Sequence, residues 1–92
     1  MRVAQLINSR FNAVKNQFVI SDGSKTTFQS YSSKICTYDE ENNTLVLYPE
    51  WDYSNTTRTH FKTFINDFTS FEYKNRQKWL KEIENNNSIK LI

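Results

Sequence analysis

The sequence contains one cysteine, one histidine, one glycine and one proline among its 92 residues. The lone Cys36 cannot form a disulfide within the chain, which favours a reducing compartment. Cys36 and His60 lack the short ligand spacing of a protein metal site, so we expect no metal and no other cofactor. Gly23 alone cannot supply a glycine-rich loop for an oxyanion. With so little glycine and proline, the turns must be made by Asn, Asp and Ser.

Long apolar runs and a strong charge of one sign are also missing. No run approaches the roughly 20 residues that a membrane-spanning helix needs, and residues 1–7 become polar too soon for a signal peptide. The net charge is +2, and the two halves balance: residues 1–48 carry five Lys/Arg and four Asp/Glu, and residues 49–92 carry seven and six. A domain-scale basic field for DNA is therefore excluded. We expect one cytoplasmic domain over residues 1–92.

The first half of the chain has the period of two that is typical of strands. One predicted strand places four side chains on one face: Val14, Asn16, Phe18 and Ile20. Three more strands are predicted over residues 26–31, 34–38 and 44–48, joined by short polar turns. Residues 2–10 fit either a strand or a helical turn, and residues 88–92 fit a short final strand. These segments predict an antiparallel meander of about four strands.

After Pro49 the apolar period becomes helical. A stripe within a third of the helix circumference predicts a first helix that covers the sheet, and its members are Phe61, Phe64, Ile65 and Phe68. A second helix is predicted from about Glu72 to Glu84. Its apolar side consists of Trp79, Leu80 and Ile83, with Tyr73 at the edge. The whole chain is therefore expected to be an α+β domain: a small antiparallel β-meander with two helices packed on one face.

The start of the first predicted helix has two interpretations. Ser54, Asn55 or Thr56 can cap the helix by accepting hydrogen bonds from free backbone N–H groups. The same hydroxyls, together with Arg58 and His60, can instead hold a phosphate or carboxylate at the helix N-terminus. On a helical wheel, however, the two basic side chains diverge by roughly 160° and cannot easily grip one anion. Capping is the favoured interpretation.

Two segments resemble a known family: Phe28-Gln29-Ser30-Tyr31-Ser32-Ser33-Lys34-Ile35, and the stretch from Trp51 to Phe61. The chain resembles small proteins of unknown function from phages, plasmids and integrative elements of low-GC Gram-positive bacteria. Those proteins carry a Ser-Tyr-x-Thr strand and a Tyr-Ser-x-Thr-Thr-x-Arg-His helix start. Here Ser30-Tyr31, Tyr53-Ser54, Thr56-Thr57 and His60 fit the pattern. Arg58 stands one place early, and Ser32 or Ser33 replaces the strand threonine. The resemblance implies an accessory gene of a mobile element and no particular reaction.

Catalysis is not expected. A Cys–His pair is sufficient for nucleophilic chemistry, and Cys36 and His60 are the only candidates. Cys36, however, lies inside a predicted strand between Ile35 and Thr37, where a small buried thiol is ordinary. We therefore expect a protein that is not an enzyme and that has no catalytic residues.

A protein partner fits the sequence better. Five aromatic residues gather around the predicted hairpin and helix start: Tyr31, Tyr38, Tyr48, Trp51 and Tyr53. Tyr and Trp are favoured interface anchors, and an acidic loop at a hairpin tip suits a basic groove on a nucleic-acid enzyme. The residues predicted to bind a partner are Tyr38, Asp39, Glu40, Glu41, Trp51, Tyr53, Arg58 and His60. An exposed strand edge could also pair two copies into a homodimer.

These observations lead to one expected function and one alternative. We expect a protein-binding accessory protein of a phage or mobile element, and specifically an inhibitor of a host defence nuclease in the manner of anti-CRISPR proteins; its partner would be a host CRISPR effector or another nucleic-acid enzyme. The alternative is a small nucleic-acid-binding regulator that uses a basic face of the second helix, formed by Lys74, Lys78 and Lys81.

Overall fold

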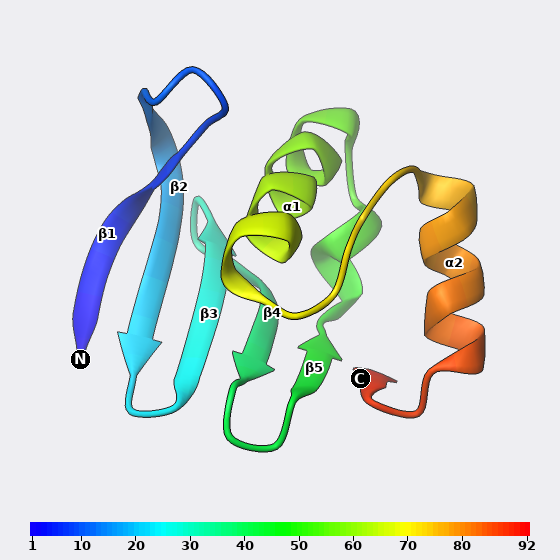
Figure 1. Cartoon of the computed structure of the whole chain (residues 1–92). Coiled ribbons are helices and arrows are strands. Elements are labelled where there is room, and N and C mark those ends of the chain that lie inside the picture. Colours follow the sequence, from blue (N-terminus) through cyan, green and yellow to red (C-terminus); the bar gives the residue numbers. More distant parts are fainter.

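A computed structural model describes residues 1–92 and shows an α+β architecture (Figure 1). Six strands form one sheet in sequential order. The strands are β1 (Arg2–Ile7), β2 (Ala13–Asp22), β3 (Lys25–Ser30), β4 (Ser33–Asp39), β5 (Thr44–Leu47) and β6 (Ile89–Leu91). The first five are antiparallel to their neighbours, and β6 runs parallel to β5. The predicted α+β class and the two helices are confirmed, whereas the expectation of about four strands is wrong.

The two strands beyond the predicted four lie at the two edges of the sheet. Residues 2–10, which fitted either a strand or a helical turn, contain β1, and residues 88–92, which fitted a short final strand, contain β6. β1 pairs with β2 from Arg2↔Ser21 to Gln5↔Phe18, and its register then shifts, so its alternation is short and interrupted. β6 has only three residues. It can run parallel to β5 because the intervening helices carry the chain back to the same end of the sheet, as a parallel pair requires.

One face of the sheet carries the core. Val19, Phe28, Cys36 and Leu47 oppose one another in adjacent strands and are all buried. On β2, therefore, Val19 faces the helices, whereas Phe18 and Ile20 lie on the opposite side and are only partly buried. The predicted strand face that contains Phe18 and Ile20 is thus the uncovered one.

Helix α1 (Asn55–Phe68) lies across the buried face of the sheet (Figure 1). Ser54 is its N-cap, because its Oγ accepts a hydrogen bond of 3.1 Å from the Thr57 N–H. Three of the four residues of the predicted stripe are buried against the sheet, namely Phe61, Phe64 and Ile65. The prediction is wrong for Phe68, which is the last residue of α1 and is 43% exposed. The Phe64 ring stacks on Phe28 of β3 with centroids 5.6 Å apart, which fixes the helix on the sheet.

Helix α2 (Arg76–Asn85) starts four residues later than predicted. Asn75 caps it by accepting a 2.9 Å hydrogen bond from the Lys78 N–H. The preceding residues therefore connect the helices without being helical, and Tyr73 is buried within that connection. Its ring contacts Trp79 of α2 at a centroid distance of 5.6 Å. Neither helix has both the length and the apolar character needed to cross a membrane.

A short 3-10 helix, η1 (Pro49–Asp52), joins β5 to the start of α1. It buries Trp51, whose ring lies 5.6 Å from that of Phe61. Pro49 stands in the first turn of η1, where a missing N–H is tolerated. Trp51 holds η1 against the core. The residues that follow η1 therefore have a fixed position at the end of the sheet.

Candidate functional site

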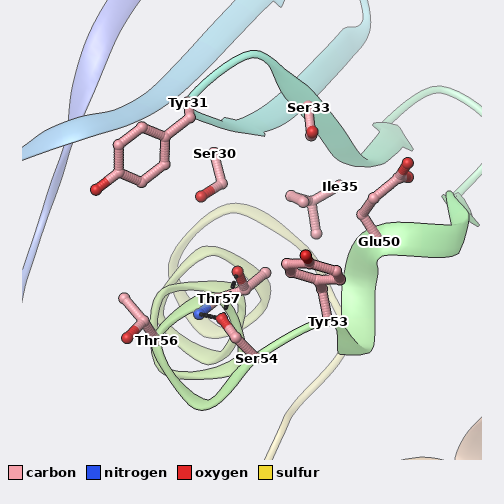
Figure 2. A pocket seen from close by; sticks show the side chains of 9 residues that line it. All are labelled: Ser30, Tyr31, Ser33, Ile35, Glu50, Tyr53, Ser54, Thr56 and Thr57. Carbon is pink, nitrogen blue, oxygen red and sulfur yellow. Dashed lines mark hydrogen bonds between the residues drawn. The ribbon is translucent and has the colours of Figure 1, made fainter.

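A groove of about 540 Å³ lies between the β3–β4 hairpin and the start of α1 (Figure 2). Its lining is formed by Ser30, Tyr31, Ser33, Ile35, Glu50, Tyr53, Ser54, Thr56 and Thr57. Figure 2 shows Tyr31 and Glu50 toward opposite ends, with Ile35 and Tyr53 between them. The volume falls within the range of about 300–1,000 Å³ that is usual for ligand-binding clefts.

The hairpin wall of the groove presents Tyr31. This residue adopts a left-handed backbone conformation with φ of 55°, and its N–H donates a 2.7 Å hydrogen bond to the Asn16 carbonyl. A bulky side chain in this region is uncommon and costs on the order of 1 kcal/mol or more. The ring is nevertheless 63% exposed, so it contributes little to the core in return. An aromatic ring is thus held in solvent on a constrained turn.

The opposite wall presents Tyr53 and Glu50. Tyr53 follows η1 and is 81% exposed. Glu50 is exposed as well and takes part in none of the ion pairs of the structure. η1 and the capped start of α1 hold both residues, so the two exposed tyrosines face the same groove from rigid elements on either side.

The Ser54 and Thr57 hydroxyls serve the helix start. Ser54 Oγ accepts from the Thr57 N–H and donates to Thr57 Oγ1 at 3.1 Å, the contacts dashed in Figure 2. Thr57 is also buried. Helix capping therefore accounts for both Ser54 and Thr57. The exposed side chains of the groove are those of the two tyrosines, Glu50 and Thr56.

Two of the residues predicted to bind a partner belong to the core. Tyr38 is buried, and its hydroxyl donates a 2.7 Å hydrogen bond to Asn43 Oδ1. Trp51 is buried against Phe61. A ring that is enclosed in the core is not available to a partner, so these two aromatics act through folding.

The acidic residues lie far from the groove. Asp39 ends β4, whereas Ser33 of the groove begins it, and six residues of strand span about 20 Å. The side-chain amide of Asn42 donates to Asp39 at 2.8 Å, and this hydrogen bond is the main cause that lowers the Asp39 pKa. Glu40 and Glu41 are exposed at the tip of the turn. The structure therefore separates the acidic tip from Tyr53.

Arg58 has an internal role. It donates a 3.0 Å hydrogen bond to Asp52 Oδ1 and another to Asn55. Arg76 of α2 approaches the same carboxylate, with Nη2 2.6 Å from Oδ2 and Nε 3.1 Å from Oδ1. The hydrogen bonds from Arg76, and then those from Arg58, lower the Asp52 pKa. Asp52 thus joins η1 to both helices, a contact that spacing in the sequence did not predict.

The Cys36 and His60 side chains offer little chemistry. Cys36 is completely buried, and burial raises the pKa of its thiol far above the ordinary value. A thiol held in its protonated form is a poor nucleophile. Partial burial lowers the pKa of His60, which favours the neutral imidazole at pH 7. No group of three or more His, Cys, Asp or Glu side chains is placed to hold a metal ion.

The three lysines of the predicted basic face do not share one helix. Lys74 precedes α2 and lies 3.4 Å from Glu72 in an ion pair. Lys78 and Lys81 are exposed on α2 itself, next to Glu82. The predicted three-lysine helix stripe is therefore wrong, because Asn75 starts the helix only after Lys74.

The sequence offered one signal for the groove. The two segments on which the family resemblance rests, Phe28–Ile35 and Trp51–Phe61, face each other across it. Tyr31 was named among the aromatic residues near the hairpin and helix start but not among the predicted binding residues. Ser33 and Glu50 were not predicted as site residues at all, because nothing in their spacing shows that the hairpin turn meets the helix start.

The fold and the groove together define a small α+β domain with an aromatic-rimmed cleft at one end of its sheet. The chain belongs to a family of unknown function, DUF8033, whose sequence profile matches residues 1–82. No curated protein and no solved structure matches the chain.

Proposed function

We propose that this protein is a non-enzymatic binding protein that recognises another protein through the groove between Tyr31 and Tyr53. One observation carries the proposal: two exposed tyrosines, 63% and 81% accessible, line the same cleft from opposite walls. Tyrosine combines a large rigid contact area with a polar hydroxyl, and it is enriched among residues that dominate binding energy.

The rigidity of the groove supports the proposal. Tyr31 sits on a tight hairpin turn, and Tyr53 lies between η1 and the N-cap Ser54. Side chains on fixed backbone lose less conformational entropy on association than those on mobile loops.

The groove lining supports a binding role over catalysis. It contains hydroxyl groups, two phenols and the Glu50 carboxylate, but neither the histidine nor the cysteine of the chain. Cys36 is buried in the sheet. Nucleophilic catalysis ordinarily needs a base within hydrogen-bond reach of an activated nucleophile, and binding by surface complementarity needs neither.

The biological setting is proposed from the family resemblance. We infer an accessory protein of a phage or other mobile element that acts in the cytoplasm of the bacterial host, most concretely as an inhibitor of a host defence nuclease. Such nucleases carry basic surfaces for nucleic acid, which the acidic tip at Glu40 and Glu41 and the separate Glu50 can complement.

Affinity capture tests the proposal. The tagged protein is incubated with bacterial host lysate, with and without nuclease treatment, and retained proteins are identified by mass spectrometry. We expect a nuclease-resistant partner that is retained by wild type and by Phe11→Ala, and lost by Tyr53→Ala. Phe11 is a matched control because it is 89% exposed and lies outside the groove. Inhibition of the captured nuclease is then measured directly.

The alternative function gives a different result. A nucleic-acid-binding regulator that uses Lys74, Lys78 and Lys81 would retain proteins only through nucleic acid, so nuclease treatment would remove them. Its binding would also fall steeply with salt. Either behaviour would contradict a direct protein partner.

The β1 edge offers a second contact, to another copy of the chain. β1 has six residues with Arg2 as its only charged side chain, and Val3 is 58% exposed. Edge strands of this length usually carry charges or proline that prevent pairing. We propose antiparallel β1–β1 pairing in a homodimer. Light scattering should give twice the monomer mass for wild type and the monomer mass for Val3→Lys; a monomeric wild type would contradict the proposal.

A further inference from the structure

The groove has an unbalanced charge. Among its nine lining residues, Glu50 is the only one with a charged side chain, and no Lys, Arg or His is present. Glu50 is exposed and has no ion-pair partner within the protein. A carboxylate at the end of a cleft that has two tyrosine rings and no cation is complementary to a positively charged group.

We infer that the groove receives an arginine side chain from the partner protein, with Glu50 as its counter-charge, the Tyr53 ring beside it and Tyr31 toward the other end of the groove. This inference rests on the proposed function and specifies what that site recognises. A guanidinium fits better than an ammonium because it binds carboxylate in bidentate geometry and stacks on aromatic faces. The exposed Tyr53 ring offers apolar surface to the aliphatic stem, whereas Ile35 at the bottom of the groove is only 1% exposed.

The N-terminal end of α1 opposes the binding of a cation. Its free N–H groups carry a partial positive charge of about half an elementary unit, which favours an anion. Ser54 already accepts from the Thr57 N–H, and this capping reduces the number of free donors. The full negative charge of Glu50 exceeds the partial charge of the helix end, so the groove favours a cation. An acidic ligand is the competing outcome that the experiment must separate.

Nuclear magnetic resonance with three short peptides tests the inference. The probes are acetyl-Gly-Arg-Gly-amide, the same peptide with neutral citrulline, and the same peptide with glutamate, each titrated into isotope-labelled protein. We expect the arginine peptide to shift the backbone amides of residues 30–33 and 53–57. The citrulline and glutamate peptides should bind more weakly by about threefold or more, as expected for a partly exposed ion pair. Equal shifts with citrulline, stronger binding of glutamate, or no shift in these residues would overturn the inference.

A pair of charge variants adds a matched control. Glu50→Gln and Glu84→Gln remove the same charge from exposed positions, one in the groove and one on helix α2, outside the groove. Only Glu50→Gln should weaken the arginine peptide, by about threefold or more. If both variants bind it like wild type, Glu50 is not the counter-charge.

The captured partner separates this inference from the proposed function. A partner that is lost by Tyr53→Ala but bound equally by wild type and Glu50→Gln would contradict arginine recognition and leave the protein-binding role intact. A partner that binds every groove variant as tightly as wild type would contradict both the arginine inference and the proposed function.

Discussion

Phe61 and Trp79 meet edge to face, with ring centroids 5.7 Å apart, and this contact joins helix α1 to helix α2. Phe61 also contacts Trp51 of η1 at 5.6 Å and Tyr73 of the connection at 5.8 Å. The Phe61 ring therefore links α1 to η1, to the connection between the helices and to α2. Such aromatic pairs contribute about 0.5–1.5 kcal/mol beyond their burial.

Phe61→Ala should strongly destabilise the protein. Phe61 is completely buried, so its removal leaves a cavity surrounded by three aromatic rings, and we expect a loss of about 3–5 kcal/mol in the free energy of unfolding. Urea denaturation measures this loss. Phe11→Ala removes the same ring type from an exposed position and should change stability by less than about 0.5 kcal/mol. Similar effects of the two variants would contradict the described core.

The two helix caps should contribute similar amounts to the free energy of unfolding. Ser54 and Asn75 each accept a hydrogen bond from a backbone N–H in the first turn of their helix. Ser54→Ala and Asn75→Ala should each lower the free energy of unfolding by about 1 kcal/mol. Thr56→Ala serves as a control, since Thr56 is exposed in the first turn and caps nothing. A Ser54→Ala variant as stable as wild type would show that another residue caps α1.

Asp52 should make the protein sensitive to acid. Its pKa is lowered by Arg76 and Arg58, so the stabilising charge is fully present above the unfolded-state pKa of about 3.9 and is lost as pH falls through the lower folded-state pKa. Asp52→Asn should therefore be less stable than wild type at pH 7, and the difference should shrink below about pH 4. Denaturation at several pH values measures it. Asp67→Asn is the control, because Asp67 forms no ion pair.

Cys36 should resist modification while the protein is folded. Its thiol is completely buried, and its raised pKa leaves almost no thiolate at pH 8. A thiol reagent should react rapidly in denaturant and slowly in its absence, at a rate limited by unfolding. Fast labelling under native conditions would mean that the thiol is accessible and would reopen a chemical role for it.

The structure shows which sequence patterns were informative and why. Periodicity identified the stripe on α1, because Phe61, Phe64 and Ile65 repeat at helical spacing and nothing interrupts them. It did not identify the covered face of β2, since Phe18 and Ile20 are as apolar as Val19. When both faces of a strand are apolar, the alternation of apolar and polar residues does not show which face is covered, because tertiary packing decides this.

The candidate site depended on contacts that no local pattern encodes. Tyr53 was predicted as a partner-binding residue and is exposed. Tyr31, on the opposite wall of the groove, comes from a turn more than 20 residues earlier. Arg58 was also predicted to be available, whereas it is bonded to Asp52. The pairing of Asp52 with Arg76, 24 residues apart, follows from the packing of α2 and has no signal in the sequence.

Tyr31→Gly should separate binding from stability. Glycine adopts the left-handed conformation of this turn without the steric penalty of a side chain, so the variant should keep or raise the melting temperature. It also removes the exposed ring, so partner binding should weaken. Phe11→Gly is a matched control, because Phe11 has φ of 62° and is exposed outside the groove. A Tyr31→Gly variant that melts well below wild type would show that the ring stabilises the fold.

The most direct test of the groove is the dissociation constant of the captured partner, measured by calorimetry for four proteins: wild type, Tyr31→Gly, Tyr53→Ala and Phe11→Gly. We expect each tyrosine variant to bind about tenfold more weakly or worse, as expected for an interface anchor, and Phe11→Gly to bind like wild type. Unchanged affinity in both tyrosine variants, with the folds intact, would contradict the assignment of this groove as the partner site.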